Sequence, residues 1–212
     1  MEMISQGAEA KIYLEDGIVV KERISKGYRH PIIDKQIRIR RTRQEGKILY
    51  KAKLFGVNVP AVLNLDKHNI PKDDFLLKME YISGDKLSEK LNEYSKEKQH
   101  EVMKKLGKQV FILHLNDIIH GDLTTSNTIL KDSEIFIIDF GLGFFSTKIE
   151  DRAVDLHLIK QALEAKHYMN FDELFNAFLE GYNSNDDKSG MRDKVLDQLR
   201  KVETRGRYKD KY

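Results

Sequence analysis

Two short motifs in the middle of the chain carry side chains that could catalyse phosphoryl transfer. The first runs from His120 to Asn127 (His-Gly-Asp-Leu-Thr-Thr-Ser-Asn), and the second is Ile138-Asp-Phe-Gly141. Asp122 lies five residues before Asn127, and Asp139 lies twelve residues after it. In a site with this spacing the first aspartate lies beside the acceptor hydroxyl, while the asparagine and the second aspartate hold magnesium ions that bridge nucleotide phosphates. We therefore predict Asp122 as the catalytic residue, and Asn127 and Asp139 as ligands of Mg²⁺.

The second motif alone would be a weak indication of this chemistry. A turn after the apolar run Ile135–Ile138 would also favour Asp and Gly, because both residue types suit turn backbones. The combination is more specific, since the two motifs fix several polar side chains at set distances along the chain. We therefore interpret the pair of motifs as a site for a magnesium nucleotide.

A lysine and a glutamate in the first quarter of the chain complete the expected nucleotide site. Lys21 ends the apolar run Ile18–Val20 and follows the turn residues Asp16-Gly17, which places it on a strand. Glu45 lies 24 residues later, in a segment from 37 to 55 that has helical periodicity. Each residue alone could be an ordinary surface charge. Together they match the strand lysine that binds ATP phosphates and the helix glutamate that holds it.

The loop expected to cover the phosphates is Ser5-Gln-Gly-Ala-Glu-Ala10, which contains a single glycine. Gly7 would let the backbone approach a phosphate, although a plain hairpin turn would also fit this segment. Glu9 has no role in this interpretation, because a carboxylate repels phosphates unless a cation lies between them. Further along, we predict Glu80 to Ile82 as the hinge that binds adenine, with Met79 at the back of its pocket. Gly7, Lys21, Glu45, Met79, Glu80 and Ile82 are thus the predicted ATP-binding residues.

The elements that must position these residues form two predicted lobes, residues 1–82 and 83–212. The first lobe is expected to be β-rich, and the second helical, since all three prolines lie at or before Pro71. The segment between Gly141 and a helix expected near Asp151 is short and contains no Ala-Pro-Glu, so the peptide-binding platform of protein kinases is absent. Strands are predicted at 3–5, 11–14, 18–21, 61–65 and 75–81, and helices at 37–55, 95–116, 151–166, 171–182 and from 191 onward.

Composition predicts a folded protein located in the cytoplasm and not in a membrane. The chain has 212 residues, 40% of them hydrophobic, and no cysteine. No apolar stretch approaches the roughly 18 residues that a membrane span needs. The overall charge of +3 is unevenly distributed, because residues 21–53 contain twelve Lys or Arg and only three acids. Its helical part, residues 35–53, could be a solvated helix face or a surface for nucleic acid.

The C-terminal segment 200–212 is also basic, with six Lys or Arg against two acids and little apolar content on which to fold. Binding to nucleic-acid phosphates is therefore the favoured interpretation for this segment. The predicted contacts are Arg205, Arg207, Lys209 and Lys211.

Several segments together resemble the small atypical kinase of the KEOPS complex, archaeal type. They are Gly7–Ala10, Val20–Arg23, Tyr28–Pro31 (Tyr-Arg-His-Pro), Arg41–Arg43 (Arg-Thr-Arg) and the two motifs described first, so the resemblance covers essentially the whole chain. One departure is Gly46, where the family more often has alanine. Glycine at this position costs up to about 1 kcal/mol of helix propensity.

The resemblance implies an α+β, two-lobed protein-kinase-like fold with a truncated activation segment. It further implies an ATP-dependent serine/threonine kinase or ATPase that participates in making threonylcarbamoyladenosine (t6A) on tRNA. The implied partners are the threonylcarbamoyl-transferase subunit, to which archaeal members are sometimes fused, a small KEOPS subunit that binds the first lobe, and tRNA. We expect ATP turnover within the assembly, with phosphorylation of itself or a partner as a secondary capacity.

Three other functions remain as alternatives. Small-molecule phosphotransferases of the aminoglycoside or choline type also use His-Gly-Asp, but they carry an acceptor-binding insertion for which this chain has no room. A RIO-type ribosome-assembly kinase also lacks the peptide platform, although Thr124–Ser126 and Tyr28–Pro31 favour the KEOPS kinase. A non-catalytic nucleotide sensor would not need the complete set of Lys21, Asp122, Asn127 and Asp139.

Overall fold

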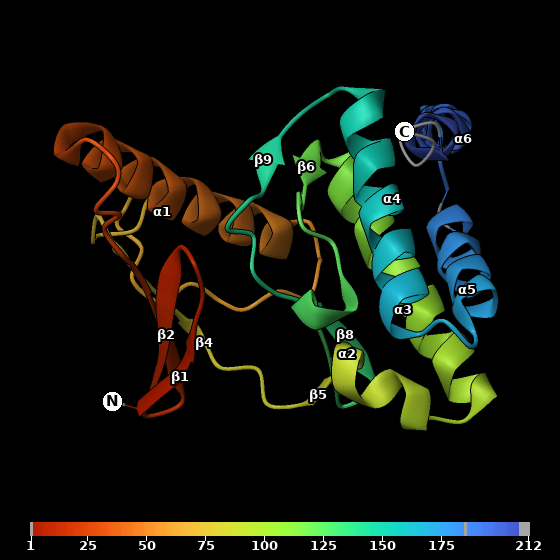
Figure 1. Ribbon diagram of the computed structural model, residues 1–212, viewed down its shortest axis with the longest axis horizontal. Coiled ribbons are helices and arrows are strands. Elements are labelled where there is room, and N and C mark those ends of the chain that lie inside the picture. The colour runs from red at the N-terminus through yellow and green to blue at the C-terminus, as the bar shows by residue number, and fades with distance from the viewer. Residues whose placement is uncertain (1, 185, 208–212) are drawn as a thin grey trace.

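The computed structural model describes residues 2–184 and 186–207, with side chains up to Thr204 (Figure 1). The strands of the first part and helix α1 lie on one side, and the long helices α3 to α6 on the other. The predicted α+β fold with a β-rich and a helical lobe is confirmed, whereas the boundary between residues 82 and 83 stays a prediction. The predicted RNA contacts Arg205, Arg207, Lys209 and Lys211 lie outside the described side chains.

An antiparallel sheet in the order β1-β2-β3-β4 forms the first lobe together with a long helix. Its strands are β1 (Glu2–Gln6), β2 (Ala10–Glu15), β3 (Ile18–Arg23) and β4 (Leu76–Glu80), and the helix is α1 (Pro31–Leu54). Asp16 (φ 50°) and Gly17 (φ 76°) join β2 to β3, which is the left-handed backbone that a two-residue hairpin requires. Ile48 and Leu49 of α1 and Leu77 of β4 belong to one buried core, so the helix is held against the sheet.

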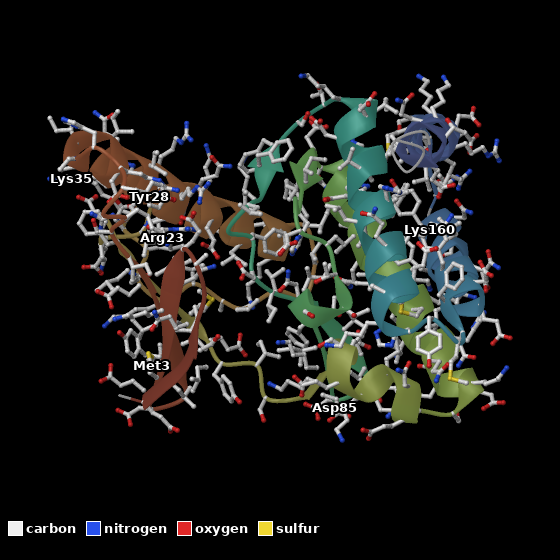
Figure 2. The ribbon with its side chains drawn as sticks, viewed as in Figure 1. Met3, Arg23, Tyr28, Lys35, Asp85 and Lys160 are labelled. Carbon is white, nitrogen blue, oxygen red and sulfur yellow. The ribbon has the colours of Figure 1, made fainter. Side chains whose placement is uncertain are left out.

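Helix α1 begins six residues before the predicted start at residue 37. Its first turns have few buried apolar residues, so the helical period is weak there. Pro31 stands at the first helical position, where its missing N–H has no cost. Buried Asp34 then anchors this end, since it accepts hydrogen bonds from Arg38 Nε at 2.7 Å and from the Lys26 N–H at 3.3 Å. Tyr28 and Lys35 lie at this outer end of α1, away from the C-terminal helices (Figure 2).

The predicted strand at 61–65 is wrong. Only isolated bridges form here, between Val62 and Met79 and between Leu65 and Pro71. The N–H of Lys78 in β4 donates to the side-chain Oδ1 of Asn64 at 3.0 Å, and not to a backbone carbonyl of this segment as it would in a regular strand pair. An apolar run of this length therefore follows the sheet edge without joining it as a strand.

The second lobe is built on α3 (Lys96–Leu115), α4 (Ile149–Lys166), α5 (Phe171–Asn183) and α6 (Met191–Arg207). Helix α3 packs along α5 and α4 packs along α6. Two glycines allow the close crossing of α3 and α5: a Cβ at Gly107 would lie 2.0 Å from Phe178 O, and one at Gly181 would lie 1.9 Å from Lys104 O. Since α6 extends to Arg207, the first residues of the basic C-terminal segment are helical.

Several short elements between the two lobes carry the polar motifs. Strands β5 (Asp85–Lys86), β7 (Thr128–Lys131) and β8 (Glu134–Ile137) form one small sheet, and β6 (Ile118–Ile119) pairs with β9 (Phe144–Phe145). Short helices α2 (Leu87–Lys90), η1 (Leu91–Glu93) and η2 (Thr125–Asn127) connect them. Two-residue strands show no periodicity that a sequence could reveal. Among residues 2–184 and 186–207, no helix has the length and apolar character that a bilayer-spanning segment requires.

Gly46, the departure from the related kinases, is explained by tight packing. A Cβ built at this position would lie 2.5 Å from Pro71 Cγ and 3.0 Å from Pro71 Cδ. We expect Gly46→Ala to lower the free energy of unfolding by about 1–2 kcal/mol, because the cost of overpacking exceeds the gain in helix propensity. Urea unfolding would measure this, and Gly46→Ala combined with Pro71→Ala should be more stable than Gly46→Ala alone. A more stable Gly46→Ala protein would contradict the packing explanation.

Candidate active site

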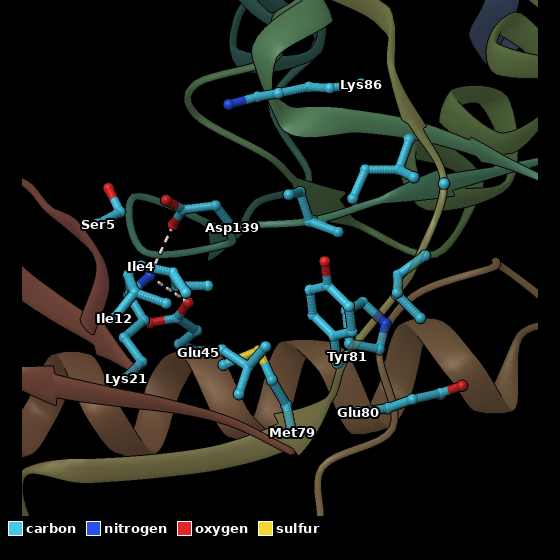
Figure 3. A pocket seen from close by; sticks show the side chains of 16 residues that line it. Ile4, Ser5, Ile12, Lys21, Glu45, Met79, Glu80, Tyr81, Lys86 and Asp139 are labelled. Carbon is cyan, nitrogen blue, oxygen red and sulfur yellow. Dashed lines mark hydrogen bonds and ion pairs between the residues drawn. The ribbon is translucent and has the colours of Figure 1, made fainter. Parts of the chain in front are cut away.

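Two adjoining cavities lie where the sheet meets the small strands of the second lobe. The first has a volume of about 360 Å³, and its walls include Val19, Met79, Tyr81 and Ile82 (Figure 3). The second, of about 270 Å³, is lined by the loop that contains Gly7 and by charged side chains of both lobes. The two cavities share Ser5, Ile12, Lys21 and Asp139, so they form one continuous cleft. An apolar compartment beside a charged one suits a ligand with a flat base at one end and phosphates at the other.

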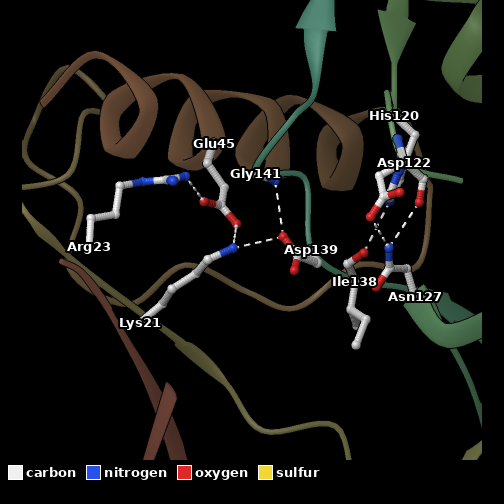
Figure 4. A network of polar contacts seen from close by, with 9 residues as sticks. All are labelled: Lys21, Arg23, Glu45, His120, Asp122, Asn127, Ile138, Asp139 and Gly141. Atoms are coloured by element: carbon white, nitrogen blue, oxygen red, sulfur yellow. Dashed lines mark hydrogen bonds and ion pairs between the residues drawn. The ribbon is translucent and has the colours of Figure 1, made fainter. Parts of the chain in front are cut away.

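Lys21, itself buried, lies at the centre of a network of charges (Figure 4). Its Nζ donates to Glu45 Oε1 at 2.7 Å and to Asp139 Oδ1 at 2.7 Å. Burial lowers the pKa of Lys21, but the carboxylates of Glu45 and Asp139 outweigh it and hold this pKa above its usual value. Burial raises the pKa of Asp139, and the nearby Lys21 ammonium outweighs it and holds that pKa below its usual value. The pair is therefore charged, and the structure brings together three residues that the sequence placed in one site.

Arg23 is a site residue that sequence reasoning missed. Its Nη2 donates to Glu45 Oε2 at 2.5 Å, so Glu45 binds one cation with each carboxylate oxygen. The signal for it was available, because alternate residues of a strand face the same side and Arg23 follows Lys21 by two positions. Lys21, Arg23 and Glu45 are all at most 6% exposed, so this charge cluster is removed from solvent.

The loop between β6 and β7 holds Asp122 and Asn127 against each other. Asn127 Nδ2 donates to Asp122 Oδ2 at 3.0 Å and to the Asp122 carbonyl oxygen at 2.9 Å. The Asp122 N–H donates to His120 Nδ1 at 3.2 Å, so the ring carries its proton on Nε2, which donates to the Ile138 carbonyl at 3.0 Å. His120 therefore ties the loop of Asp122 to the residue that precedes Asp139.

A buried aspartate on α4 binds the backbone of this loop. It was not predicted from the sequence. Asp155 accepts from the His120 N–H at 2.6 Å and from the Gly121 N–H at 2.8 Å. Gly121 has φ +78°, and a Cβ there would lie 2.5 Å from the Leu142 carbonyl oxygen. Glycine is thus required where protein kinases have arginine. The interactions of Asp155 span about 35 residues of sequence, which no local pattern reveals.

Asp139 stands in a left-handed backbone conformation with φ +61°. A residue other than glycine costs about 1–3 kcal/mol in such a sparsely populated conformation, and functional sites are where it is usually found. Here Lys21 and the Gly141 N–H, which donates to Asp139 Oδ1 at 3.1 Å, hold the side chain in place. The strained backbone keeps the carboxylate, which is half exposed, directed into the cleft.

The donor set fits a magnesium ion that is bound together with a nucleotide. Asp139 supplies carboxylate oxygens, and Asn127 binds Asp122 through its nitrogen, which leaves its amide oxygen as a ligand. Within the part of the chain that the structure describes, no three His, Cys, Asp or Glu side chains cluster as a complete metal site. Mg²⁺ is commonly held by one or two protein carboxylates plus substrate phosphates, so this sparse set is what a nucleotide-dependent site needs.

The predicted hinge borders the apolar compartment, but its side chains face different ways. Ile82 is buried, and Met79 packs in the core between the sheet and α1. The Glu80 side chain accepts from the Ala61 N–H at 3.3 Å, and the Glu80 N–H donates to the Ala61 carbonyl at 2.9 Å. Both of these groups of Glu80 are therefore occupied by Ala61, so a base in this compartment would meet other groups of the hinge.

The segment after Gly141 is short and is bound to α1. Gln44 Nε2 donates to the Gly143 carbonyl oxygen, and the ammonium groups of Lys47 and Lys51 lie 5.8 Å and 5.0 Å from the centre of the Phe145 ring. Strand β9 then leads into α4 at Ile149. There is consequently no room between Gly141 and α4 for a peptide-binding platform.

The fold and the site define a nucleotide-dependent phosphotransferase of the protein-kinase-like class. Comparison with known proteins is more specific. A family model described as the RIO domain matches residues 13–144. The chain is 42% identical to the KEOPS complex subunit Bud32 of Pyrococcus abyssi, over 100% of this chain and 98% of that protein.

Two further relatives are similarly close in sequence. The EKC/KEOPS complex subunit bud32 of Dictyostelium discoideum is 40% identical over 98% of this chain and 83% of that protein. A probable bifunctional tRNA threonylcarbamoyladenosine biosynthesis protein of Methanothermobacter thermautotrophicus is 38% identical over 99% of this chain, which spans 37% of that longer protein. A solved structure described as WaaP in complex with acyl carrier protein has the same fold, with a TM-score of 0.62 at 16% identity, over 96% of this chain and 88% of that one.

The chain belongs to the Bud32 family of RIO-domain kinases, which are atypical ATP-dependent kinases or ATPases.

Proposed function

We propose that this chain is the ATP-hydrolysing or phosphoryl-transferring subunit of a KEOPS assembly that makes t6A on tRNA. The observation that carries the proposal is one cleft lined by Lys21, Glu45, Asp122 and Asp139, with Asn127 bound to Asp122 and without a platform for a peptide substrate. The names of the full-length relatives support the biological setting. A cytoplasmic location remains the expectation from composition.

Each side chain has a role that follows from its contacts. Lys21, held by Glu45, neutralises the α and β phosphates of ATP, while the loop of Gly7 covers them. The hinge from Glu80 to Ile82 binds the base, with Met79 at the back of its pocket. Asp122 has one carboxylate oxygen fixed by Asn127, which leaves the other to orient a hydroxyl or a water for attack. Asp139 and Asn127 are the residues that would hold Mg²⁺, which when bound neutralises charge on the phosphate oxygens.

The acceptor must come from outside the chain or be water, because the segment after Gly141 offers no peptide platform. We therefore favour ATP hydrolysis coupled to the assembly, in contact with a threonylcarbamoyl-transferase subunit and a small subunit on the first lobe. The lobe division at residues 82 and 83 belongs to the same proposal, since it places the hinge at the junction.

Phosphate release from ATP is the measurement that tests this function. It should be compared for the chain alone, with the transferase subunit, and with both the transferase subunit and tRNA. We expect stepwise stimulation, since the assembly supplies what the isolated cleft lacks. Strong stimulation by a sugar, choline or an aminoglycoside without these partners would instead support a small-molecule phosphotransferase.

Contact with tRNA is proposed for the basic C-terminal segment more strongly than for the basic segment 21–53. In the latter, many cations are used inside the first lobe. Lys21 and Arg23 bind Glu45, Arg38 binds Asp34, and Arg29 and Arg41 bind Glu9. Much of that positive charge is therefore already paired with carboxylates of the same lobe.

Neutralising the four C-terminal cations should weaken tRNA binding in a salt-dependent manner. We expect the combined change of Arg205, Arg207, Lys209 and Lys211 to Gln to reduce the slope of log K against log[salt] by roughly 0.7–0.9 for each tRNA phosphate that the variant no longer neutralises. Binding measured between about 50 and 200 mM salt would show this. The matched control changes the exposed lysines 90, 96, 98 and 188 to Gln. An equal reduction in slope in the control would contradict a specific role for the C-terminal segment.

A further inference from the structure

Glu9, which had no role in the sequence interpretation, is bound by two arginines. Its Oε1 accepts from Arg29 Nη2 at 3.2 Å, and its Oε2 lies 2.9 Å from Arg41 Nη1. Lys26 Nζ also donates to the carbonyl oxygen of Ala8, the neighbouring loop residue. The phosphate loop is thus fastened by cations to the connection between β3 and α1 and to α1 itself. The carboxylate is neutralised where it would otherwise repel a phosphate.

Arg41 also lines the second cavity, together with Lys21, Asp122 and Asp139. It precedes Glu45 by four residues in α1, and residues with this spacing lie on the same face of a helix. Glu45 faces the centre of the site, so Arg41 lies one turn further along the same wall. This position is on the side of the second cavity where the loop of Gly7 and Glu9 lies, away from the hinge that lines the first cavity.

We expect a terminal phosphate in the second cavity to require a cation in addition to Lys21 and Arg23. A loop with a single glycine offers fewer closely approaching backbone N–H groups to a terminal phosphate than a glycine-rich loop would. Lys21 is bound to Glu45 and Asp139, and Arg23 is bound to Glu45. Arg41 carries five N–H donors, of which the contact with Glu9 engages Nη1.

The other arginines near the loop are placed differently. Arg29 contacts Glu9 but does not line either cavity. Arg38 is bound to Asp34 at 2.7 Å, and its guanidinium lies over the Phe75 ring at 4.2 Å. Arg43 projects to the surface, where it pairs with Asp74 at 2.9 Å. Arg23 also lines the second cavity, but its side chain is only 4% exposed and is bound to Glu45, whereas the side chain of Arg41 is 29% exposed. Arg41 is therefore the more accessible of the two arginines on this cavity.

We propose that Arg41 contacts the terminal phosphate of bound ATP, and that Glu9 positions its guanidinium for this contact. The planar guanidinium binds phosphate oxygens in pairs, and such charge-assisted hydrogen bonds are about twice as strong as neutral ones. The inference rests on the proposed ATP site and adds to it a residue that distinguishes ATP from ADP. Because ADP lacks the terminal phosphate, its affinity should not depend on Arg41.

Calorimetric titration of Mg-ATP and Mg-ADP separates this contact from nucleotide binding in general. We expect Arg41→Ala to weaken ATP binding roughly tenfold to hundredfold and to change ADP binding less than about twofold, as one charged hydrogen-bonded contact would. Arg41→Lys should lie between, because it keeps the charge and loses the paired donors. Arg43→Ala, two residues away on the same helix, is the matched control and should leave both affinities unchanged.

Two further variants test the role of Glu9. Glu9→Ala removes the carboxylate that holds Arg41 Nη1, so ATP binding should weaken while ADP binding stays unchanged. Unchanged ATP binding would show that Glu9 does not position Arg41. Arg29→Ala removes the other partner of Glu9 without removing a cation from the cavity, and its ratio of ATP to ADP affinity should stay close to that of the wild type.

Equal weakening of ATP and ADP by Arg41→Ala would overturn the proposal, since Arg41 would then act only by holding the loop. Unchanged affinity for both nucleotides would overturn it as well. If the proposed ATP site itself were wrong, the titrations would differ in another way, because the wild-type protein would then bind neither ATP nor ADP.

Discussion

Asp139→Ala should reduce magnesium-dependent ATP turnover about a thousandfold in the assembled complex. Removing one fixed electrostatic contact to a reacting group typically lowers kcat by a factor of about 10²–10³, and the loss of a metal ligand can lower it somewhat more. Asp139 is the carboxylate of the cleft that both faces the second cavity and contacts Lys21. Its loss removes a proposed magnesium ligand and one of the two carboxylates that orient the Lys21 ammonium.

Steady-state phosphate release at several magnesium concentrations would measure this effect. Asp139→Asn retains the size of the side chain and one oxygen, so it should keep part of the turnover at high magnesium. Asp172→Ala is a suitable control, because Asp172 lies exposed in the first turn of α5. Normal magnesium-dependent turnover by Asp139→Ala would show that the roles are wrongly assigned.

The residues that could be predicted from the sequence are those held by local spacing. Asp122, Asn127 and Asp139 belong to motifs with fixed intervals. The structure places Asp122 and Asp139 on one cavity with Lys21, and Asn127 contacts Asp122. The pairing of Lys21 with Glu45 across 24 residues was also predicted, and the two atoms lie 2.7 Å apart. These placements could be predicted because a strand and a helix put such residues in a small number of positions, whereas the catalytic and metal-binding roles of the residues stay predictions.

Residues whose partners lie far along the chain could not be predicted in this way. Asp155 serves a loop 34 residues earlier, and Arg41 is interpretable only once the loop of Glu9 is folded beside α1. The same reason applies to Gly107 and Gly181, which are required by the crossing of two helices and not by their own backbones. Sequence patterns report local geometry, whereas these residues are selected by contacts between elements.

The start of α1 and the absent strand at 61–65 show a related limit. Asp34 and Asn64 are polar side chains that accept hydrogen bonds from backbone N–H groups. A prediction based on the spacing of hydrophobic residues does not detect such contacts. Both lie in the first lobe, where ion pairs such as those of Glu45 add to the apolar packing of α1 on the sheet. The nucleotide site is part of this polar packing, so its residues should affect stability as well as activity.

Substitution of Glu45 tests directly whether a residue of the nucleotide site also stabilises the first lobe. Glu45→Ala should lower the free energy of unfolding by about 3–5 kcal/mol, because breaking a buried ion pair leaves a charge without a partner. Lys21 would still have Asp139, but Arg23 would lose the carboxylate that its Nη2 contacts while remaining only 4% exposed. A loss of this size is a large share of the roughly 5–15 kcal/mol that stabilises a typical domain.

Urea unfolding of three variants would separate the structural role of Glu45 from its catalytic one. Arg23→Met combined with Glu45→Met should recover most of the stability, since no unpaired buried charge remains and buried ion pairs can be replaced by apolar residues without loss. The double variant should nevertheless turn over ATP slowly, because Lys21 then lacks the carboxylate that orients it toward the phosphates. Glu93→Ala, which removes an exposed partner of Lys90, should change neither property. If Glu45→Ala and Glu93→Ala unfolded at the same urea concentration, the buried network would not stabilise the first lobe, and the position of Lys21 would have to be set by the sheet alone.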